Sequence, residues 1–193
     1  MFLSISQAFT MMMAGIPMFG PDTCGFAGNT DYQLCSRWMA LSAFYPFYRS
    51  HNIKAAIGQE AYRWSSVAEA SRRAMSVRYS SLNYMYTLFY HAHTAGETVV
   101  RALVWEFPEE YLAATYNQFL LGPPILVTPV LELNVDYVKG VFPGIGEGTR
   151  WYDWYNLTEV TEVQPRENVT LAAPLEQVNV HVNQPSSSNA RPY

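Results

Sequence analysis

Two titratable side chains follow apolar segments at points where binding and catalytic residues commonly lie. Asp22 comes two residues after the apolar run Gly15–Gly20, and His51 holds a similar place after Phe44–Tyr48. A carboxylate accepts hydrogen bonds, and a neutral imidazole can accept or donate them. If both runs are strands of one parallel barrel, their carboxyl ends lie on one face and the two side chains share a pocket. The alternative is structural, with Asp22 capping a turn and His51 on the surface.

Cys24 and Cys35 are the only two cysteines of the chain. They can close one small disulfide loop beside Asp22, or they are two unpaired buried thiols. Structural zinc needs four ligands, which two cysteines do not supply. Two glycosylation sequons, beginning at Asn156 and Asn168, favour a secretory route.

Three other clusters are explained without a metal or a cofactor. His91 and His93 are two positions apart on an expected helix, so they point to different faces. The glycines of the run FPGIGEGT (142–149) do not match the dinucleotide fingerprint, and no helix is expected after them. The cluster WYDWY around Asp153 could stack against a sugar, but aromatic strands commonly give the same pattern. We therefore expect no metal and no cofactor.

The composition is that of a folded, aromatic-rich protein. Of the 193 residues, 49% are hydrophobic and 15% are charged, and the formal net charge is −4. This argues against a disordered chain, and the lack of a basic run argues against nucleic-acid binding. The first twenty residues are apolar but have no positively charged start, and Pro17 and Gly20 interrupt them short of a membrane span. We expect a buried helix there and no membrane anchor.

The first half of the chain alternates between helix and strand patterns, which is typical of a parallel α/β sheet or barrel. Ser66 and Glu69 fit a capping box at the start of the longest helix. A bend is expected in that helix near Ser80–Asn83, and Gly96 is expected to end it. The pattern predicts helices over 4–13, 31–43 (with Thr30 as cap) and 66–95, and wholly buried strands over 15–20 and 44–48.

Beyond Gly96 the pattern becomes β-rich, so we place a domain boundary near residue 97. The last segment, 183–193, is polar and rich in Pro and Ser, which predicts disorder. β-Branched and aromatic runs with turn residues between them predict strands over 98–105, 124–132, 135–142, 150–155 and 177–182.

One long stretch is similar to a known family. It reads GIPMFGPDTCGFAGNTDYQLCSRWMALSAFYPFYRSHN (15–52) and resembles the seventh and eighth barrel strands of glycoside hydrolase family 31, in particular its secreted fungal-type α-glucosidases. The similarity continues through QEAYRW, SVAEASRRAMSVRY, YMYTLFYHAHTAG, VVRALVWEFPEE, QFLLGPPILVTPVLE and WYDWY to about Val182. Two departures stand out. The family usually has a proline where this chain reads SLNYMY (81–86), and the chain leaves the family pattern after Val182.

The resemblance implies a fold that combines an α/β part and a β part. Residues 1–97 are then the last part of a TIM (β/α)8 barrel, with strands seven and eight and the helices that follow them. Residues 98–182 are the start of a β-sandwich domain, the proximal C-terminal one, and are incomplete. Residues 183–193 are a divergent, disordered tail.

The resemblance also implies an activity. Family members are retaining glycosidases that cleave α-glucosidic bonds with two Asp residues, whose carboxyl groups stand roughly 5 to 5.5 Å apart in a retaining enzyme. Both precede the seventh strand in the family, so we expect neither here and expect the chain alone to be inactive. The implied substrates are α-glucosides and malto-oligosaccharides, the implied location is extracellular, and the implied partner is the remainder of the barrel.

Three substrate-binding residues carry over from the family motifs. The Asp of the D-x-C-G-F motif matches Asp22, and the His of the R-x-H-N motif matches His51; both would bind hydroxyls of the glucose that is attacked. Phe26 matches an aromatic residue of the same pocket, and the two cysteines match a disulfide that braces the loop. Two rival hypotheses remain: a non-catalytic sugar-binding protein that uses the same pocket, and a disulfide-linked structural module.

Overall fold

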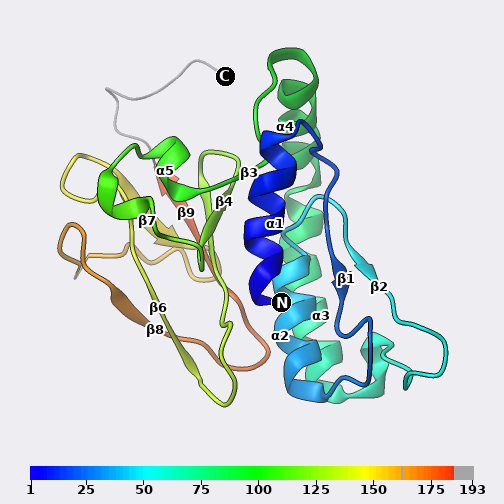
Figure 1. Cartoon of the computed structure of the whole chain (residues 1–193). Coiled ribbons are helices and arrows are strands. Elements are labelled where there is room, and N and C mark those ends of the chain that lie inside the picture. The colour runs from blue at the N-terminus through cyan, green and yellow to red at the C-terminus, as the bar shows by residue number, and fades with distance from the viewer. Residues whose placement is uncertain (162, 185–193) are drawn as a thin grey trace.

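The computed structural model describes residues 1–161 and 163–184, which form a mixed helix and sheet structure (Figure 1). Four helices group on one side, and strands β3 to β9 lie on the other, with α1 next to them (Figure 1). Residues 185–193 of the expected disordered tail lie outside the described residues, whereas Asn183 and Gln184 complete strand β9. The helices are α1 (Phe2–Met13), α2 (Tyr32–Ser42), α3 (Ser65–Ser80) and α4 (Leu82–Ala95).

The long helical segment divides as the sequence predicts. Ser81 separates α3 from α4, with φ −99° and ψ 4°, and its hydroxyl donates to the carbonyl of Val77 at 2.9 Å. Gly96 follows α4 in the left-handed region, with φ 72°. Both the bend and the glycine cap are therefore confirmed.

Two predicted helix starts are wrong. Asp31, and not Thr30, caps α2, because its Oδ1 accepts the backbone N–H of Leu34 at 2.9 Å. A carboxylate there also suits the positive end of the helix dipole. The capping box of Ser66 and Glu69 does not form, because α3 begins one residue earlier and Glu69 instead pairs with the arginines that follow it, at 72 and 73.

The strands expected over 15–20 and 44–48 are also wrong. The described part of this half contains one strand pair, β1 (Asp22–Thr23) and β2 (Arg49–Ser50), which run parallel directly beyond the expected strands. The expected segments do approach each other, because the N–H of Phe47 donates to the carbonyl of Phe19 at 3.0 Å. Each segment contains a proline, which has no N–H for a ladder, so regular pairing begins only after it.

The first of these segments is not buried as expected. Ile16 is 50% exposed and Met18 is 58% exposed. Phe44 and Tyr45 in the second segment are buried, but Phe47 is exposed. Parallel sheets normally have both faces covered, and closing a barrel requires all of its strands.

The isolated chain is therefore expected to self-associate at micromolar concentration and to bind a hydrophobic dye. Size-exclusion chromatography with light scattering, and fluorescence of the dye anilinonaphthalene sulfonate, measure this. A monodisperse monomer with a sharp thermal transition and no dye signal would contradict it.

The second half is β-rich. Its main sheet has the order β3-β4-β5-β9-β7, with every neighbouring pair antiparallel, and β6 pairs with β8 separately. All five predicted runs contain strand residues, but the run 98–105 contains only the two residues of β3 and then enters the short helix α5 (Leu103–Glu106). β4 and β8 were not predicted. The strands are β3 (Val100–Arg101), β4 (Phe119–Leu121), β5 (Ile125–Thr128), β6 (Tyr137–Gly140), β7 (Arg150–Asp153), β8 (Val169–Ala172) and β9 (Asn179–Gln184).

Both faces of the main sheet are buried. Phe119 of β4 belongs to the core shared with the helices, and Tyr45 stacks on it with ring centroids 5.6 Å apart. Leu120, the next residue, points to the other face and belongs to a second cluster around Trp151. One continuous core therefore connects the helices to the sheet.

A buried arginine adds polar contacts to this junction. Arg37 of α2 is only 6% exposed. Its guanidinium donates to the carbonyls of Val135 at 3.0 Å, Ala173 at 2.8 Å, Pro174 at 2.8 Å and Gln177 at 3.5 Å. One side chain on a helix therefore satisfies carbonyls in two separate loops of the β-rich half.

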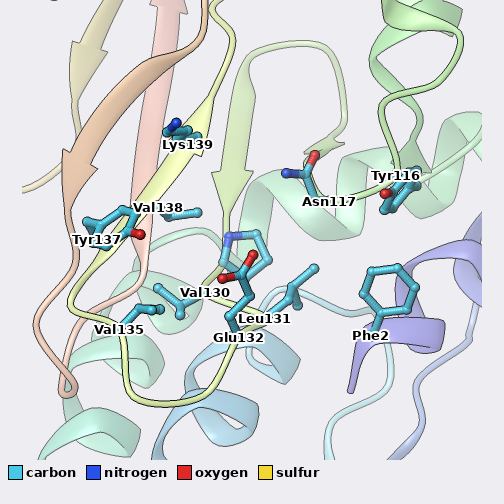
Figure 2. A pocket seen from close by; sticks show the side chains of 11 residues that line it. Phe2, Tyr116, Asn117, Val130, Leu131, Glu132, Val135, Tyr137, Val138 and Lys139 are labelled. Atoms are coloured by element: carbon cyan, nitrogen blue, oxygen red, sulfur yellow. The ribbon is translucent and has the colours of Figure 1, made fainter.

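A cavity of about 330 Å³ lies at the same junction (Figure 2). In Figure 2 the rings of Phe2 and Tyr116 lie together on one side of it, and Tyr137 and Lys139 of β6 lie on the other. Glu132 projects between them. The cavity opens between α1 and β6, and none of the predicted site residues lines it.

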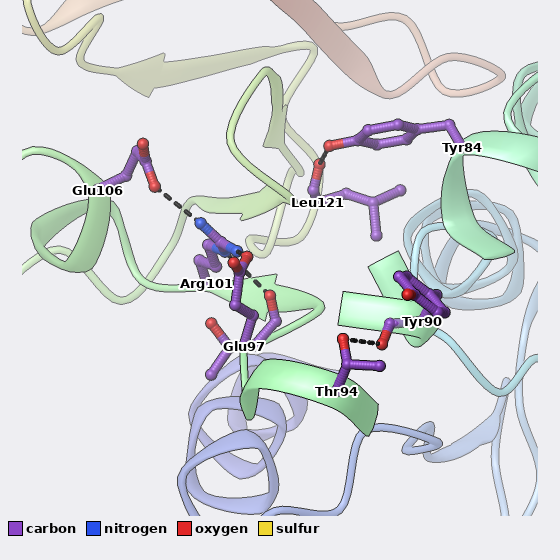
Figure 3. A network of polar contacts seen from close by, with 8 residues as sticks. Tyr84, Tyr90, Thr94, Glu97, Arg101, Glu106 and Leu121 are labelled. Atoms are coloured by element: carbon purple, nitrogen blue, oxygen red, sulfur yellow. Dashed lines mark hydrogen bonds and ion pairs between the residues drawn. The ribbon is translucent and has the colours of Figure 1, made fainter. Parts of the chain in front are cut away.

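A network of ion pairs and hydrogen bonds connects the end of the helices to β3 and β4 (Figure 3). Arg101 is 7% exposed and donates to Glu97 at 2.7 Å and to Glu106 at 2.8 Å. Nearby, the hydroxyl of Tyr84 donates to the carbonyl of Leu121 at 3.2 Å. These contacts fix how the helical segment enters the sheet.

His181 of β9 is buried, and this burial lowers its pKa to about 4, although the nearby charge of Asp153 opposes the shift. Its ring meets Phe142 edge-on, with centroids 4.7 Å apart. In the unfolded chain the imidazole titrates near its ordinary pKa of about 6.5. The neutral form therefore contributes its full stability above pH 6.5, and the contribution falls as the pH drops towards about 4.

Acidification from pH 7.5 to 4.5 is thus expected to lower the free energy of unfolding through His181 by about 2–3 kcal/mol. Urea denaturation at submicromolar concentration, followed by tryptophan fluorescence, gives this loss. Over the same pH range, the free energy of unfolding of the variant His181→Leu should fall by about 2–3 kcal/mol less than that of the unchanged chain. Equal losses in the two proteins would show that His181 does not titrate as described.

Candidate functional site

The parallel pair β1–β2 brings Asp22 opposite Arg49. Nε of Arg49 donates to Oδ1 of Asp22 at 2.9 Å, and a terminal nitrogen of the guanidinium contacts the same oxygen. The guanidinium also lies over the ring of Phe47, 5.4 Å from its centroid. The side chain of Asp22 is 24% exposed, so it can still be reached by a ligand.

The other two predicted site residues contact each other. The rings of Phe26 and His51 are stacked, with centroids 5.6 Å apart and an interplanar angle of 28°. The backbone N–H of Ile53 donates to the carbonyl of Phe26 at 3.1 Å, which holds the two loops side by side. His51 is exposed, and Phe26 is 44% exposed.

The strand pair also brings Asp22 near His51. Asp22 lies opposite Arg49, and His51 is two residues beyond Arg49. Asp22 and Arg49 are register partners and so lie on one face of the strand pair, and His51 follows directly after β2. The structure therefore brings all the predicted substrate-binding residues to two neighbouring loops.

Cys24 and Cys35 form a disulfide, which settles the alternatives that the sequence left open. Both residues are fully buried, and Cys24 has a positive φ of 81°. The disulfide connects the loop after β1 to the first turns of α2. It thus restrains the segment that carries Asp22 and Phe26.

Gln59 is a structural residue of the site that the sequence analysis missed. It is 4% exposed, and its Nε2 donates to the carbonyl of Thr23 at 2.9 Å and to the hydroxyl of Ser50 at 3.2 Å. Its Oε1 accepts the N–H of Gly25 at 3.1 Å. One amide therefore connects both loops. Glutamine side chains are mostly exposed in folded proteins, so the residue type alone did not indicate that Gln59 is buried between the two loops.

The arrangement suits a ligand rich in hydroxyl groups. Asp22 supplies acceptor oxygens, His51 supplies a donor or acceptor, and Phe26 supplies an apolar ring. The described residues include no cluster of three or more His, Cys, Asp or Glu side chains that could hold a metal ion.

The histidine pair and the WYDWY cluster, for which the sequence favoured structural explanations, lie on α4 and around β7 and not on the loops after β1 and β2. His91 and His93 are on α4, where the ring of His91 meets Tyr90. Within WYDWY, Trp151 is fully buried, and Oδ1 of Asp153 accepts the N–H of Tyr155 at 2.8 Å in a turn. Trp151 is therefore not available to stack against a sugar.

The asparagines of both sequons, Asn156 and Asn168, are exposed. The Oδ1 of Asn156 accepts the N–H of Thr158 at 2.8 Å, so the sequon forms a local turn. Across the residues that the structure describes, no helix has both the length and the apolar character needed to span a membrane.

Comparisons with known proteins show the family to which the chain is similar. The profile of the glycosyl hydrolases family 31 TIM-barrel domain matches residues 1–88, and the profile of the glycosyl hydrolase family 31 C-terminal domain matches residues 96–186. An alpha-glucosidase of Aspergillus oryzae is 59% identical over 183 residues, covering 94% of this chain and 18% of the relative. An alpha-glucosidase of Aspergillus niger is 57% identical with the same coverage.

Solved structures give the same result. The crystal structure of a glucosidase II alpha subunit matches 93% of this chain and 19% of that protein, with a TM-score of 0.86 and 30% identity. A Flavobacterium johnsoniae GH31 dextranase complexed with glucose matches with a TM-score of 0.81, at 29% identity, over 92% of this chain and 22% of that protein. The chain therefore spans about a fifth of the length of the relatives that it matches.

Proposed function

Because the chain belongs to glycoside hydrolase family 31, we propose that it is a segment of a retaining α-glucosidase and that it supplies part of the glucose-binding pocket of that enzyme. The observation that carries this proposal is the joint position of Asp22, His51 and Phe26 on two loops that a buried glutamine connects, the first of which is also bound to α2 by a disulfide. Relatives that are 57–59% identical are named as alpha-glucosidases.

Each residue has a role in this proposal. Asp22 accepts hydrogen bonds from hydroxyls of the glucose unit whose bond is cleaved, and His51 binds a hydroxyl of the same unit through its imidazole. Phe26 covers an apolar side of the pocket next to His51. The nucleophile and the general acid/base are two aspartates in the remainder of the barrel, outside this chain, standing roughly 5 to 5.5 Å apart as in a retaining enzyme.

The domain assignment belongs to the same proposal. Residues 1–97 are the last part of the TIM barrel, and 98–182 are the start of a β-sandwich domain. The substrates are α-glucosides and malto-oligosaccharides, and the partner that completes the site is the rest of the barrel. The exposed apolar side chains of Ile16 and Met18 support such a partner, because they would be covered by neighbouring strands.

A chimeric enzyme tests the proposal. In the Aspergillus oryzae alpha-glucosidase, the segment that matches this chain over 183 residues is replaced by this chain's own residues. We expect the chimeric enzyme to release nitrophenol from p-nitrophenyl α-glucoside and glucose from maltose, with the anomeric configuration retained. We expect the chain alone to do neither.

The outcomes separate the proposal from its rivals. A folded chimeric enzyme without glucosidase activity would contradict it. Hydrolysis by the isolated chain would also contradict it, because the chain would then hold its own catalytic carboxylates. Glucose binding by the isolated chain, abolished in Asp22→Ala, together with an inactive chimeric enzyme, would favour the non-catalytic sugar-binding protein.

We further propose that the enzyme is secreted and glycosylated at Asn156 and Asn168, because both sequons lie in exposed positions. After expression through a yeast secretory pathway, deglycosylation should increase the gel mobility of the chimeric enzyme. Asn156→Gln and Asn168→Gln should each remove one step of the shift that belongs to this segment. Unchanged glycopeptide masses in both variants would contradict the assignment.

A further inference from the structure

In the contact between Asp22 and Arg49, two of the three guanidinium nitrogens approach the same carboxylate oxygen. Nε donates to Oδ1 at 2.9 Å, and a terminal nitrogen contacts Oδ1 as well. A fork-to-fork pair would occupy both oxygens of the carboxylate. In the described part of the chain, no hydrogen bond to Oδ2 is formed, so this oxygen stays available to a ligand.

The backbone fixes the position of this pair. Asp22 and Arg49 are direct partners in the parallel register, and the segments before them touch through the bond from Phe47 to Phe19. Gly20 makes this approach possible, because a Cβ at this position would lie 1.7 Å from the carbonyl oxygen of Phe47. The pairing of β1 with β2 and the hydrogen bond from Phe47 to Phe19 therefore depend on this close approach of the two segments.

The guanidinium is also restrained on its own strand. It lies 5.4 Å from the ring centroid of Phe47, close enough for a cation–π contact. The next residue, Ser50, faces the opposite side and bonds to the buried Gln59. The opposite direction of Ser50 leaves Arg49 facing Asp22, and its charge stays at the carboxylate.

We propose that Arg49 is a positioning residue for substrate binding: it binds Oδ1 of Asp22 and so turns Oδ2 toward a hydroxyl of the bound glucose. This proposal rests on the proposed function, because Arg49 acts through Asp22, and the proposed function is what assigns sugar binding to Asp22. Arg49 does not touch the sugar. Its effect on the substrate passes entirely through the orientation of the carboxylate.

The test uses the chimeric enzyme with Arg49→Gln, Arg49→Lys and Asp22→Asn, alone and in combination. Misplacing a binding group by about 1 Å can reduce a rate by about 100-fold. We expect Arg49→Gln to lower kcat/KM for p-nitrophenyl α-glucoside by about 10- to 100-fold. Arg49→Lys keeps the charge but not the planar fork, so it should rescue the loss only in part.

A matched control is available on α3. Arg73 pairs with Glu69 through its own Nε at 2.7 Å, and its side chain is 48% exposed, as is that of Arg49. Arg73→Gln therefore removes a similar surface ion pair away from the pocket and should leave kcat/KM unchanged. Melting temperatures of all variants show whether a loss of activity follows a loss of structure.

Deoxy substrates provide a readout that a structural role would not change. Each monodeoxy p-nitrophenyl α-glucoside lacks one hydroxyl, and the Asp22→Asn penalty should disappear for the deoxy position that Asp22 binds. The Arg49→Gln penalty should disappear at the same position. In the double variant, Arg49→Gln should add little to the loss caused by Asp22→Asn.

The outcomes distinguish the two proposals. If Asp22→Asn reduces activity but the Arg49→Gln penalty is absent, persists on every deoxy substrate, or multiplies with that of Asp22→Asn, the positioning role is wrong and the proposed function stands. If Asp22→Asn itself leaves kcat/KM unchanged, the proposed function is wrong, and the role of Arg49 is wrong with it.

Discussion

Asp22→Asn in the chimeric enzyme is expected to reduce kcat/KM for p-nitrophenyl α-glucoside about 100-fold, because one charged hydrogen bond contributes about 1.5–3 kcal/mol and the variant also disturbs the contact with Arg49. Asparagine keeps the size of the side chain but removes its charge. Its amide group also presents a donor where the carboxylate presented an acceptor. We therefore expect Asp22→Asn to weaken the binding of the sugar and not to impair folding.

Separate kcat and KM values show at which stage Asp22 acts. A bond that is equally strong in the ground state and the transition state raises KM when it is lost, whereas a bond that strengthens in the transition state lowers kcat. We expect both changes, because the sugar ring changes shape as its glycosidic bond breaks. Glu167→Gln is the control, since this acidic residue is exposed on the β-rich half. A loss in Glu167→Gln equal to that in Asp22→Asn would contradict the assignment.

Arg37→Met is expected to have the largest effect on stability. Methionine fills part of the volume but leaves the carbonyls of Val135, Ala173 and Pro174 without the donors that lie 2.8–3.0 Å away. A buried acceptor without a partner costs about 1–3 kcal/mol, so we expect a total loss of about 4 kcal/mol after partial rearrangement. The loss should concentrate where α2 meets the β-rich half.

Hydrogen–deuterium exchange of the chimeric enzyme locates this effect. Peptides that span residues 173–178 should exchange faster in Arg37→Met, and thermal inactivation should occur several degrees lower. Arg72→Met is the matched control, because Arg72 has a 71% exposed side chain and, among the residues that the structure describes, pairs with Glu69 alone. Surface pairs of this kind contribute about 0–1 kcal/mol. Similar exchange in both variants would show that Arg37 is not important for the junction.

The sequence predicts the helices better than the strands, for a physical reason. The spacing of apolar residues and Gly96 are local signals, and they place α1 to α4 and the bend at Ser81 correctly. For the apolar runs 15–20 and 44–48, the pattern alone cannot distinguish a paired strand from an unpaired extended segment. Whether such a run pairs depends on partners far along the chain. Cap positions are also local, but Asp31 and Thr30 are adjacent, and either could have served.

The candidate site was predicted through the family motifs more than through the physics of single residues. The positions after two apolar runs singled out Asp22 and His51, whereas the resemblance added Phe26 and the roles in sugar binding, and these roles stay predictions. The disulfide that it implied is present. Arg37 and Gln59 could not be predicted, because their side-chain types are common on surfaces and their partners are distant in sequence.

The disulfide has a consequence for how such an enzyme can be produced. Its cysteines are 11 positions apart in one short stretch, so the bond can form as soon as this stretch enters an oxidising compartment, before distant strands meet. In a reducing cytosol, the loop with Asp22 would lose its covalent link to α2 and would be held only by non-covalent contacts, such as the hydrogen bonds of Gln59 and the pair of Asp22 with Arg49. Cytosolic expression in bacteria should therefore give an enzyme whose pocket is slow to assemble and easily cut by proteases at this loop, while passage through the endoplasmic reticulum supplies the missing restraint.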